Sequence, residues 1–336
     1  MTTQQVDSKA TRRGALVDES ARLERMIEIR RVEQRAMDLY DAGLIRGGMH
    51  TCIGQEATAI GVAVAARDGD WVACTYRGHG IALALGMEPV TVLAEMLGRS
   101  NGSIGGLGGS MHLSDPDIGL LPTNGIVGAQ IPIAVGAGIS AQVFGNGAIS
   151  VAVMGDGATN IGAFHESLNL AAIWQVPTLF VIENNLYGEH TRIHRSTPIV
   201  DLGTRASAYG IDHEIADGQD VAAVVRALDG AAERVRATQA PFVVELKTYR
   251  FEGHAARANA APYRPAGELD EWLERDPIDV AVKSLLERDL ADESTIAAMR
   301  DAVDHRVEAA VAEALAAPRP PLGAMFEHVY VEPQGE

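Results

Sequence analysis

Two apolar runs in the middle of the chain each end abruptly in a polar cluster. Residues 149–154 lead into Gly155-Asp156-Gly157, and residues 176–182 lead into Glu183-Asn184-Asn185. Each run has the length and the β-branched composition of a buried parallel strand. Both polar clusters are therefore expected at strand carboxyl ends, which is the edge where open α/β sheets bind ligands.

The segment between the two clusters has the pattern of a helix. Apolar residues over 163–174 recur at three and four positions, as they do along one face of an α-helix. Asp156 and Asn185 are separated by about 30 residues, the size of one strand–helix–strand unit. Glycines on both sides of Asp156 let the backbone approach a phosphate closely. Because carboxylate and amide oxygens suit Mg²⁺, the sequence predicts a site for a metal-bound diphosphate.

Further motifs extend the pattern along the chain and identify a family. In chain order they are His50 with Gly54-Gln-Glu-Ala57, Tyr76-Arg77-Gly-His79-Gly80, Gly108-Gly-Ser-Met-His112, Asn124-Gly-Ile-Val-Gly-Ala-Gln130, Phe164-His-Glu-Ser-Leu-Asn169 and Thr248-Tyr-Arg-Phe-Glu-Gly-His254. With the thiamine-diphosphate motif of the two clusters, the chain resembles the alpha subunit of the decarboxylating component of 2-oxo acid dehydrogenase complexes. The resemblance covers residues 23–326. It implies the α/β thiamine-diphosphate-binding fold, with helices on both faces of a mostly parallel sheet.

The resemblance also implies which residues hold the cofactor and its metal ion. The metal ligands would be the side chains of Asp156 and Asn185 and the backbone carbonyl of Tyr187. Asn184 would orient the loop instead. The cofactor-binding residues would be Tyr76, Arg77, Gly125, Val127, Asp156, Gly157, Ala158, Asn185, Tyr187 and His254.

Two of the ten histidines match family positions in the active-site channel. His50 and His254 are therefore the predicted catalytic residues, because imidazole titrates near neutral pH and can transfer protons there. His79, His112 and His165 also lie in matched motifs, and for them a structural role and a functional role are both open.

The function implied by the resemblance depends on a second chain. It is the decarboxylation of a 2-oxo acid, or the cleavage of acetoin, with thiamine diphosphate and Mg²⁺, followed by transfer of the acyl unit to lipoamide. A beta subunit would supply the pyrimidine-binding domain and the activating glutamate in an α₂β₂ heterotetramer, and an acyltransferase bearing lipoyl groups would be a further partner. Glu56 is interpreted as a helix residue at a subunit contact, not as that glutamate.

Two other hypotheses differ from this function. Residues 255–264 lack the acidic residues that usually follow Gly253-His254 in the family. This loop favours the alternative of a split thiamine enzyme that makes or breaks a carbon–carbon bond without lipoamide. A noncatalytic subunit is disfavoured, because every metal and phosphate position is intact.

A dinucleotide-type motif offers a rival cofactor. Gly136-Ala-Gly138 resembles the start of an NAD fingerprint, and Asp156 follows about twenty residues later. Pro132 and several glycines interrupt the strand that such a motif requires. The Gly-x-Gly is therefore interpreted as close packing of a helix against its neighbours.

Length and composition indicate one large α/β domain. The chain has 336 residues, of which 47% are hydrophobic and 5% aromatic. We expect a disordered tail at 1–20, the domain at 21–326 and a second tail at 327–336. Within the domain, 253–267 is the expected active-site loop and 268–318 the expected position of two C-terminal helices.

Charge and apolar patterning limit the partners and the location. The formal net charge of −17 argues against a nucleic-acid surface, where basic contacts to phosphate dominate affinity. No apolar run is long enough to predict a membrane span. Cys52 and Cys74 are expected to be reduced core residues, as in a cytoplasmic protein.

Overall fold

A five-stranded parallel sheet forms the centre of the computed structural model, which describes residues 14–256 and 263–327. In spatial order its strands are β1 (Trp71–Ala73), β2 (Ser150–Gly155), β3 (Thr178–Asn184), β7 (Phe242–Lys247) and β6 (Asp212–Asp217). Every neighbouring pair is parallel. The two apolar runs are the neighbouring strands β2 and β3, so the predicted α/β fold is confirmed.

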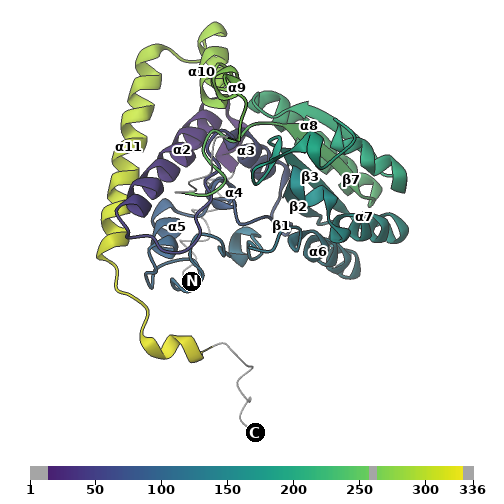
Figure 1. The fold of residues 1–336 in the computed structure, drawn as a ribbon, viewed down its shortest axis with the longest axis horizontal. Coiled ribbons are helices and arrows are strands. Elements are labelled where there is room, and N and C mark those ends of the chain that lie inside the picture. Colours follow the sequence, from purple (N-terminus) through teal and green to yellow (C-terminus); the bar gives the residue numbers. More distant parts are fainter. Residues whose placement is uncertain (1–13, 257–262, 328–336) are drawn as a thin grey trace.

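Alternate side chains of each central strand enter different cores. Val151 and Val153 of β2 belong to the larger core, whereas Ala152 and Met154 belong to the smaller one. This alternation follows from the two-residue period of a strand. The larger core is built with α2 (Glu19–Asp41), α3 (Glu56–Ala65), α4 (His79–Leu85), α5 (Pro89–Met96) and α8 (Val221–Thr238), and the smaller with α6 (Gln130–Phe144) and α7 (Gly162–Trp174) (Figure 1).

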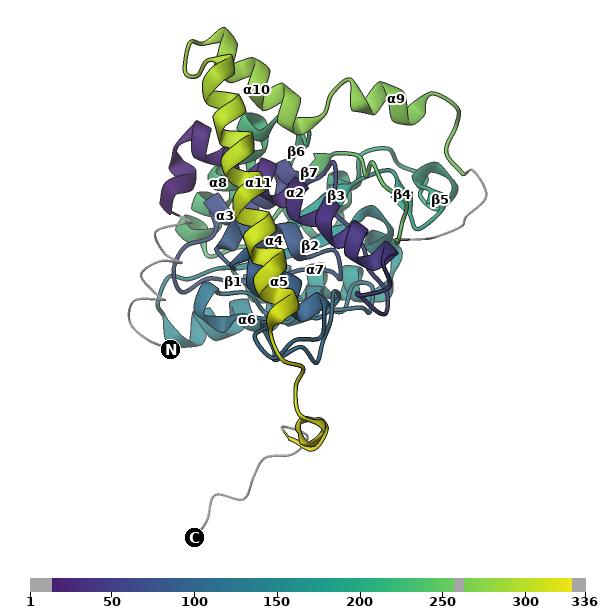
Figure 2. The ribbon, with the colours of Figure 1, turned by 90° about the vertical axis from the view of Figure 1, so that its left-hand side faces the viewer.

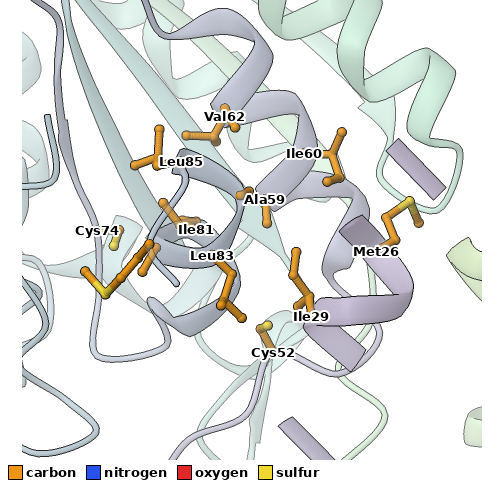
Figure 3. Packing of buried hydrophobic residues seen from close by; sticks show 14 of the residues in the cluster. Met26, Ile29, Cys52, Ala59, Ile60, Val62, Cys74, Ile81, Leu83 and Leu85 are labelled. Atoms are coloured by element: carbon orange, nitrogen blue, oxygen red, sulfur yellow. The ribbon is translucent and has the colours of Figure 1, made fainter. Parts of the chain in front are cut away.

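Side chains from α2, α3 and α4 meet in the larger core (Figure 3). Cys52 and Cys74 belong to the same core, and both are buried free thiols. Burial raises the pKa of Cys52 well above the ordinary value for a thiol. The two cysteines are therefore reduced core residues, as predicted.

Close packing explains the second glycine of the Gly-x-Gly pattern at 136–138. A Cβ atom on Gly138 would lie 2.6 Å from Val176 Cγ1 and 3.0 Å from Ser150 Oγ. The motif lies inside α6 and not at a strand-to-helix turn. The packing role inferred from sequence is therefore confirmed for Gly138 but not for Gly136, where a Cβ would meet nothing within 4 Å.

The C-terminal region contains three helices, not the predicted two. They are α9 (Glu268–Leu273), α10 (Pro277–Glu287) and α11 (Glu293–Ala316). The break between α9 and α10 arises because Asp276 caps a new helix, accepting a bond from the Ile278 amide, and Pro277 occupies its first turn. Helix α11 crosses α2 and packs against it (Figure 2), and Arg306 forms ion pairs with Glu24 and Glu28 there.

The expected disordered tail at 1–20 was wrong for its last residues. A 3-10 helix, η1, covers Ala15–Val17, and the Leu16 side chain is 2% exposed in the larger core. Helix α2 then begins at Glu19 because the Asp18 carboxylate caps it. Residues 1–13, 257–262 and 328–336, which include parts of both expected tails and of the expected loop, lie outside the described residues.

The remaining elements are short. A two-stranded antiparallel hairpin consists of β4 (Tyr187–Gly188) and β5 (Thr191–Arg192). The other 3-10 helices are η2 (Pro116–Ile118), η3 (Asp156–Asn160), η4 (Ile193–Arg195), η5 (Leu202–Tyr209) and η6 (Leu322–Phe326). None of the described helices is both long enough and apolar enough to span a bilayer.

Candidate active site at the carboxyl edge of the sheet

A cavity of about 290 Å³ lies where β2 and β3 end. Most of the sequence-predicted residues line it: Tyr76, Arg77, Val127, Asp156, Gly157, Ala158, Asn185, Tyr187 and His254. His50 is outside the lining, but its ring centroid is 4.4 Å from that of Tyr76 and 5.0 Å from that of His254. Gly125 is also outside the lining, two residues before Val127 in the same loop.

Asp156 is a buried carboxylate that has no ion-pair partner in the described parts of the chain. Strand β2 ends at Gly155, so Asp156 begins η3 with 3% of its surface exposed. Burial raises the pKa of Asp156 to about 6, although the Gly157 amide and the charge of Arg250 act in the opposite direction. A buried carboxylate of this kind is costly unless a cation compensates it.

The turn after β3 brings Asn185 and Tyr187 to the same cavity. Asn184 donates to Glu245 Oε1 at 2.6 Å and accepts from the Leu186 amide at 3.2 Å. It therefore orients the turn, as the sequence predicted. Asn185 donates to Gln55 Oε1 at 3.3 Å, and its Oδ1 is 3.4 Å from the Tyr187 amide nitrogen.

Two buried arginines contribute positive charge to the cavity. Arg77 donates to the carbonyls of Thr51 and His254, and Arg250 donates to the Glu189 carbonyl at 3.1 Å. Neither forms an ion pair with a carboxylate within the described residues. Burial, together with the charge of Arg250, lowers the pKa of Arg77 to about 10. Two cations that are buried together and bonded only to neutral groups favour an anionic ligand.

The sequence patterns did not identify a role for Arg250, although it lies in the matched motif 248–254. The signal that could have found it is its position three residues beyond β7, the strand that pairs with β3. An arginine at the carboxyl end of a third neighbouring strand faces the same ligand site as Asp156 and Asn185. Gln55, Glu183 and Glu189 line the cavity as well. Burial raises the pKa of Glu183 to about 7.

The imidazoles of His50 and His254 are neutral at pH 7. Burial and the charge of Arg77 lower the pKa of His50 to about 4 and that of His254 to about 3. In each ring Nδ1 is buried and has no hydrogen-bond partner among the described atoms. His190 has a similar buried Nε2, and its ring centroid is 6.2 Å from that of His254. The sequence had given His190 no context.

The three histidines with open roles have protein partners instead. His79 is completely buried, with Nδ1 3.0 Å from Glu33 Oε2 and Nε2 2.9 Å from Ser110. His165 is 2.8 Å from the Tyr209 hydroxyl, and His112 is 3.3 Å from the Thr123 carbonyl. These contacts support structural roles.

Glu56 is not a surface residue at a subunit contact, contrary to the sequence interpretation. Its side chain is completely buried and forms an ion pair with Arg30, which also pairs with Asp276 at 2.8 Å. The Gly54 amide donates to Glu56 Oε2 at 3.0 Å. The helical period placed Glu56 on α3, but its partners are distant in sequence and left no local signal.

Comparison with known proteins identifies the family. The sequence profile of the dehydrogenase E1 component matches residues 24–322. The chain belongs to this family. The predicted family is thus confirmed, and the chain is a component of an oxidoreductase whose family implies thiamine diphosphate as cofactor.

Relatives within the dehydrogenase E1 family are named as alpha subunits of either an acetoin oxidoreductase or pyruvate dehydrogenase. The chain is 36% identical to the alpha subunit of acetoin:2,6-dichlorophenolindophenol oxidoreductase from Bacillus subtilis, over 92% of each chain. It is 37% identical to the pyruvate dehydrogenase E1 alpha subunit of Rickettsia felis, over 91% of this chain and 93% of that one. The corresponding protein of Zymomonas mobilis is 38% identical over 91% of this chain and 87% of its own length.

Proposed function

We propose that this chain is the alpha subunit of a thiamine-diphosphate- and Mg²⁺-dependent enzyme that decarboxylates a 2-oxo acid or cleaves acetoin. The observation that carries the proposal is the set of buried charges around the cavity. Within the described residues, Arg77 and Arg250 supply positive charge without an ion-pair partner, and Asp156 supplies negative charge without one. A diphosphate with a divalent cation would compensate both. A single anion or a single cation would compensate only one.

The donor set fits Mg²⁺ better than a softer metal. Asp156 and Asn185 offer side-chain oxygens, and Tyr187 would add its backbone carbonyl. The described residues contain no cluster of three or more His, Cys, Asp and Glu side chains able to hold a metal. A shell with one carboxylate and neutral oxygens suits a hard cation that shares phosphate oxygens and water.

The remaining cavity residues would bind and orient the cofactor. Arg77 and Tyr76 would bind phosphate, and the amides of Gly157 and Ala158 would donate to it at the start of η3. Val127 would pack against the cofactor, and Gly125 would bond it through the backbone. When bound, thiamine diphosphate supplies an electron sink for the carbanion that decarboxylation leaves.

His50 and His254 would accept and donate protons during the reaction. Because both imidazoles are neutral at pH 7, each has an unshared nitrogen pair that can accept a proton. Their unpartnered Nδ1 atoms leave that capacity free for a substrate.

A beta subunit would complete the site. Val127 is 46% exposed although it lines the cavity, and Ile126, the preceding residue, is 71% exposed. Exposed apolar side chains next to a cavity favour a surface that a partner covers. The relatives named as alpha subunits also support a heteromer, and we propose the α₂β₂ assembly. Free buried Cys52 and Cys74 support a cytoplasmic location.

Lipoamide is the proposed acyl acceptor. A lipoyl-bearing acyltransferase would dock near the loop at 253–267, and residues 257–262 of that loop lie outside the described residues. The absence of acidic residues from this loop keeps the alternative, a split thiamine enzyme without lipoamide, in the proposal. Turnover with an artificial electron acceptor and with lipoamide separates the two.

Binding and assembly can be tested together. Calorimetric titration of thiamine diphosphate into the chain, alone and with its candidate beta subunit, should give Mg²⁺-dependent binding that tightens with the partner. Light scattering after size exclusion should give the mass of two alpha and two beta chains. Full activity from the alpha chain alone would refute the need for a partner, and metal-independent binding would refute the Mg²⁺ site.

A further inference from the structure

The β4–β5 hairpin is held in an unfavourable backbone conformation. Leu186 has φ +72° and Glu189 has φ +54°. The other non-glycine residues with positive φ in the described chain follow helix ends, where the left-handed conformation is common: Gln175, Gln239 and Asp289. Strained positions away from helix ends persist only where surrounding contacts hold them, and they gather at functional sites.

One carboxylate holds both strands of this hairpin. Glu268 Oε1 accepts a hydrogen bond from the Tyr187 hydroxyl at 2.7 Å, and Glu268 Oε2 is 2.8 Å from Arg192 Nη2. Tyr187 and Arg192 are opposite each other in the β4–β5 register. Glu268 and Tyr187 are 7% and 3% exposed, so their hydrogen bond is shielded from water, whereas the Arg192 side chain is 37% exposed.

The same carboxylate reaches the segment that carries Arg250. The Tyr249 hydroxyl donates to Glu268 Oε1 at 2.9 Å, and the Tyr249 ring stacks on Trp272 of α9. Just before α9, Arg264 donates to the Phe251 carbonyl at 2.8 Å and to the Arg250 carbonyl at 2.6 Å. Helix α9, which Figure 2 shows next to the β4–β5 hairpin, and the residues just before it therefore contact two segments that line the cavity.

We propose that Glu268 is a positioning residue that keeps the Tyr187 backbone in place at the metal-binding side of the cavity. This inference rests on the proposed function, because Tyr187 matters for the metal only if its backbone carbonyl is a ligand. Glu268 does not line the cavity and acts through the Tyr187 ring. Removing a group that orients a metal ligand commonly weakens metal affinity by about 10–100-fold.

If Glu268 were a purely structural residue, it would anchor α9 without changing the affinity for the metal. The two roles predict different results when Glu268 and Tyr187 are substituted together. Tyr187→Phe removes only the hydroxyl, leaving the backbone carbonyl and the Arg192 pair. If Glu268 acts through this hydroxyl, Glu268→Gln and Tyr187→Phe together should weaken metal binding by less than the product of their separate effects.

The test measures Mn²⁺ affinity by electron paramagnetic resonance at saturating thiamine diphosphate, using the full chain with its candidate beta subunit. Glu268→Gln should weaken Mn²⁺ binding by about 10-fold or more, and Tyr187→Phe by a smaller factor. Glu271→Gln, exposed on the same helix, is the matched control and should bind as the wild type does. Hydrogen exchange at the Ile193 amide, which donates to the Leu186 carbonyl, should accelerate in Glu268→Gln but not in the control.

The outcomes separate this inference from the proposed function. Wild-type affinity in Glu268→Gln, or fully independent effects of the two substitutions, would overturn the positioning role while leaving the metal site intact. A wild-type chain that binds no Mn²⁺ with thiamine diphosphate would overturn the proposed function, and this inference with it. Should Glu268→Gln fail to fold, Tyr187→Phe alone decides, since unchanged affinity there excludes action through the hydroxyl.

Discussion

Two groups of buried charges in this protein are organised in opposite ways. Between α2, α3 and α10, Arg30 pairs with Glu56 and Asp276, so each charged group has an oppositely charged partner within the chain. At the carboxyl edge of the sheet, Arg77 and Arg250 have only neutral partners, and Asp156 has no ion pair within the described residues. The first arrangement stabilises the fold. The second leaves charges available to a ligand, so the completeness of pairing separates structural from binding residues.

The largest expected effect comes from removing the unpaired carboxylate. Asp156→Ala should weaken Mg²⁺-dependent thiamine diphosphate binding by more than about 100-fold, because it deletes the only charged protein ligand. The unliganded fold should not lose stability, since an uncompensated buried charge is removed. Calorimetry and thermal unfolding measure the two quantities. Asp117→Ala, at an exposed site, is the control, and cofactor binding retained by Asp156→Ala would refute the metal assignment.

The opposite result is expected for the Arg30–Glu56–Asp276 group. Glu56→Ala should lower the free energy of unfolding by about 3–5 kcal/mol, because it leaves Arg30 buried with one partner fewer. Cofactor affinity of the folded fraction should stay unchanged. Chemical denaturation provides the measurement, with the exposed Glu313→Ala in α11 for comparison. If Glu56→Ala weakened cofactor binding without destabilising the fold, the two groups would not differ as described.

A catalytic substitution separates turnover from binding at the cavity. His254→Ala should lower turnover of the assembled enzyme by about 10²-fold, within the range for a lost acid–base group, with less effect on cofactor affinity. Steady-state rates beside a cofactor titration would show this. His305→Ala on the exposed side of α11 should have no effect. Unchanged turnover in His254→Ala would make His254 a structural residue.

The smallest effect is a pH dependence of the unliganded chain. The pKa of His254 is about 3 in the fold, below the usual value near 6.5, so the unfolded chain binds more protons between these limits. Its contribution to stability is therefore complete above about pH 6.5 and declines as the pH falls below that value. His254→Gln should reduce the loss of stability between pH 7 and pH 5. An identical slope in the two proteins would contradict the burial of a neutral imidazole.

Local patterns predicted the parts of the site that lie at the ends of two consecutive strands. The apolar runs located β2 and β3, and the polar residues after them located Asp156 and Asn185. Partners brought together by the tertiary fold left no such pattern. Arg30 and Asp276 are 246 positions apart, and Arg77 reaches His254 across 177 positions. Arg250 and Glu268 were missed for the same reason, since their roles depend on which strands and helices become neighbours.

The burial of Leu16, near the N-terminus, was not predicted from sequence for a different reason. Polar residues around Leu16 gave no apolar period, yet this single side chain is buried in the larger core beside α2 and α3. One buried residue contributes too little to a periodic signal to be recognised. Its burial depends on space left by helices that are remote in sequence.

A crystal structure of this chain with its candidate beta subunit, grown with thiamine diphosphate and Mg²⁺, tests the central claim most directly. The account predicts the diphosphate between Arg77 and Arg250, and the metal ion bound by Asp156, Asn185 and the Tyr187 carbonyl. The Arg30–Glu56–Asp276 group should be unchanged. A cofactor bound elsewhere, or a cavity whose arginines have found carboxylates of the partner instead, would contradict the account.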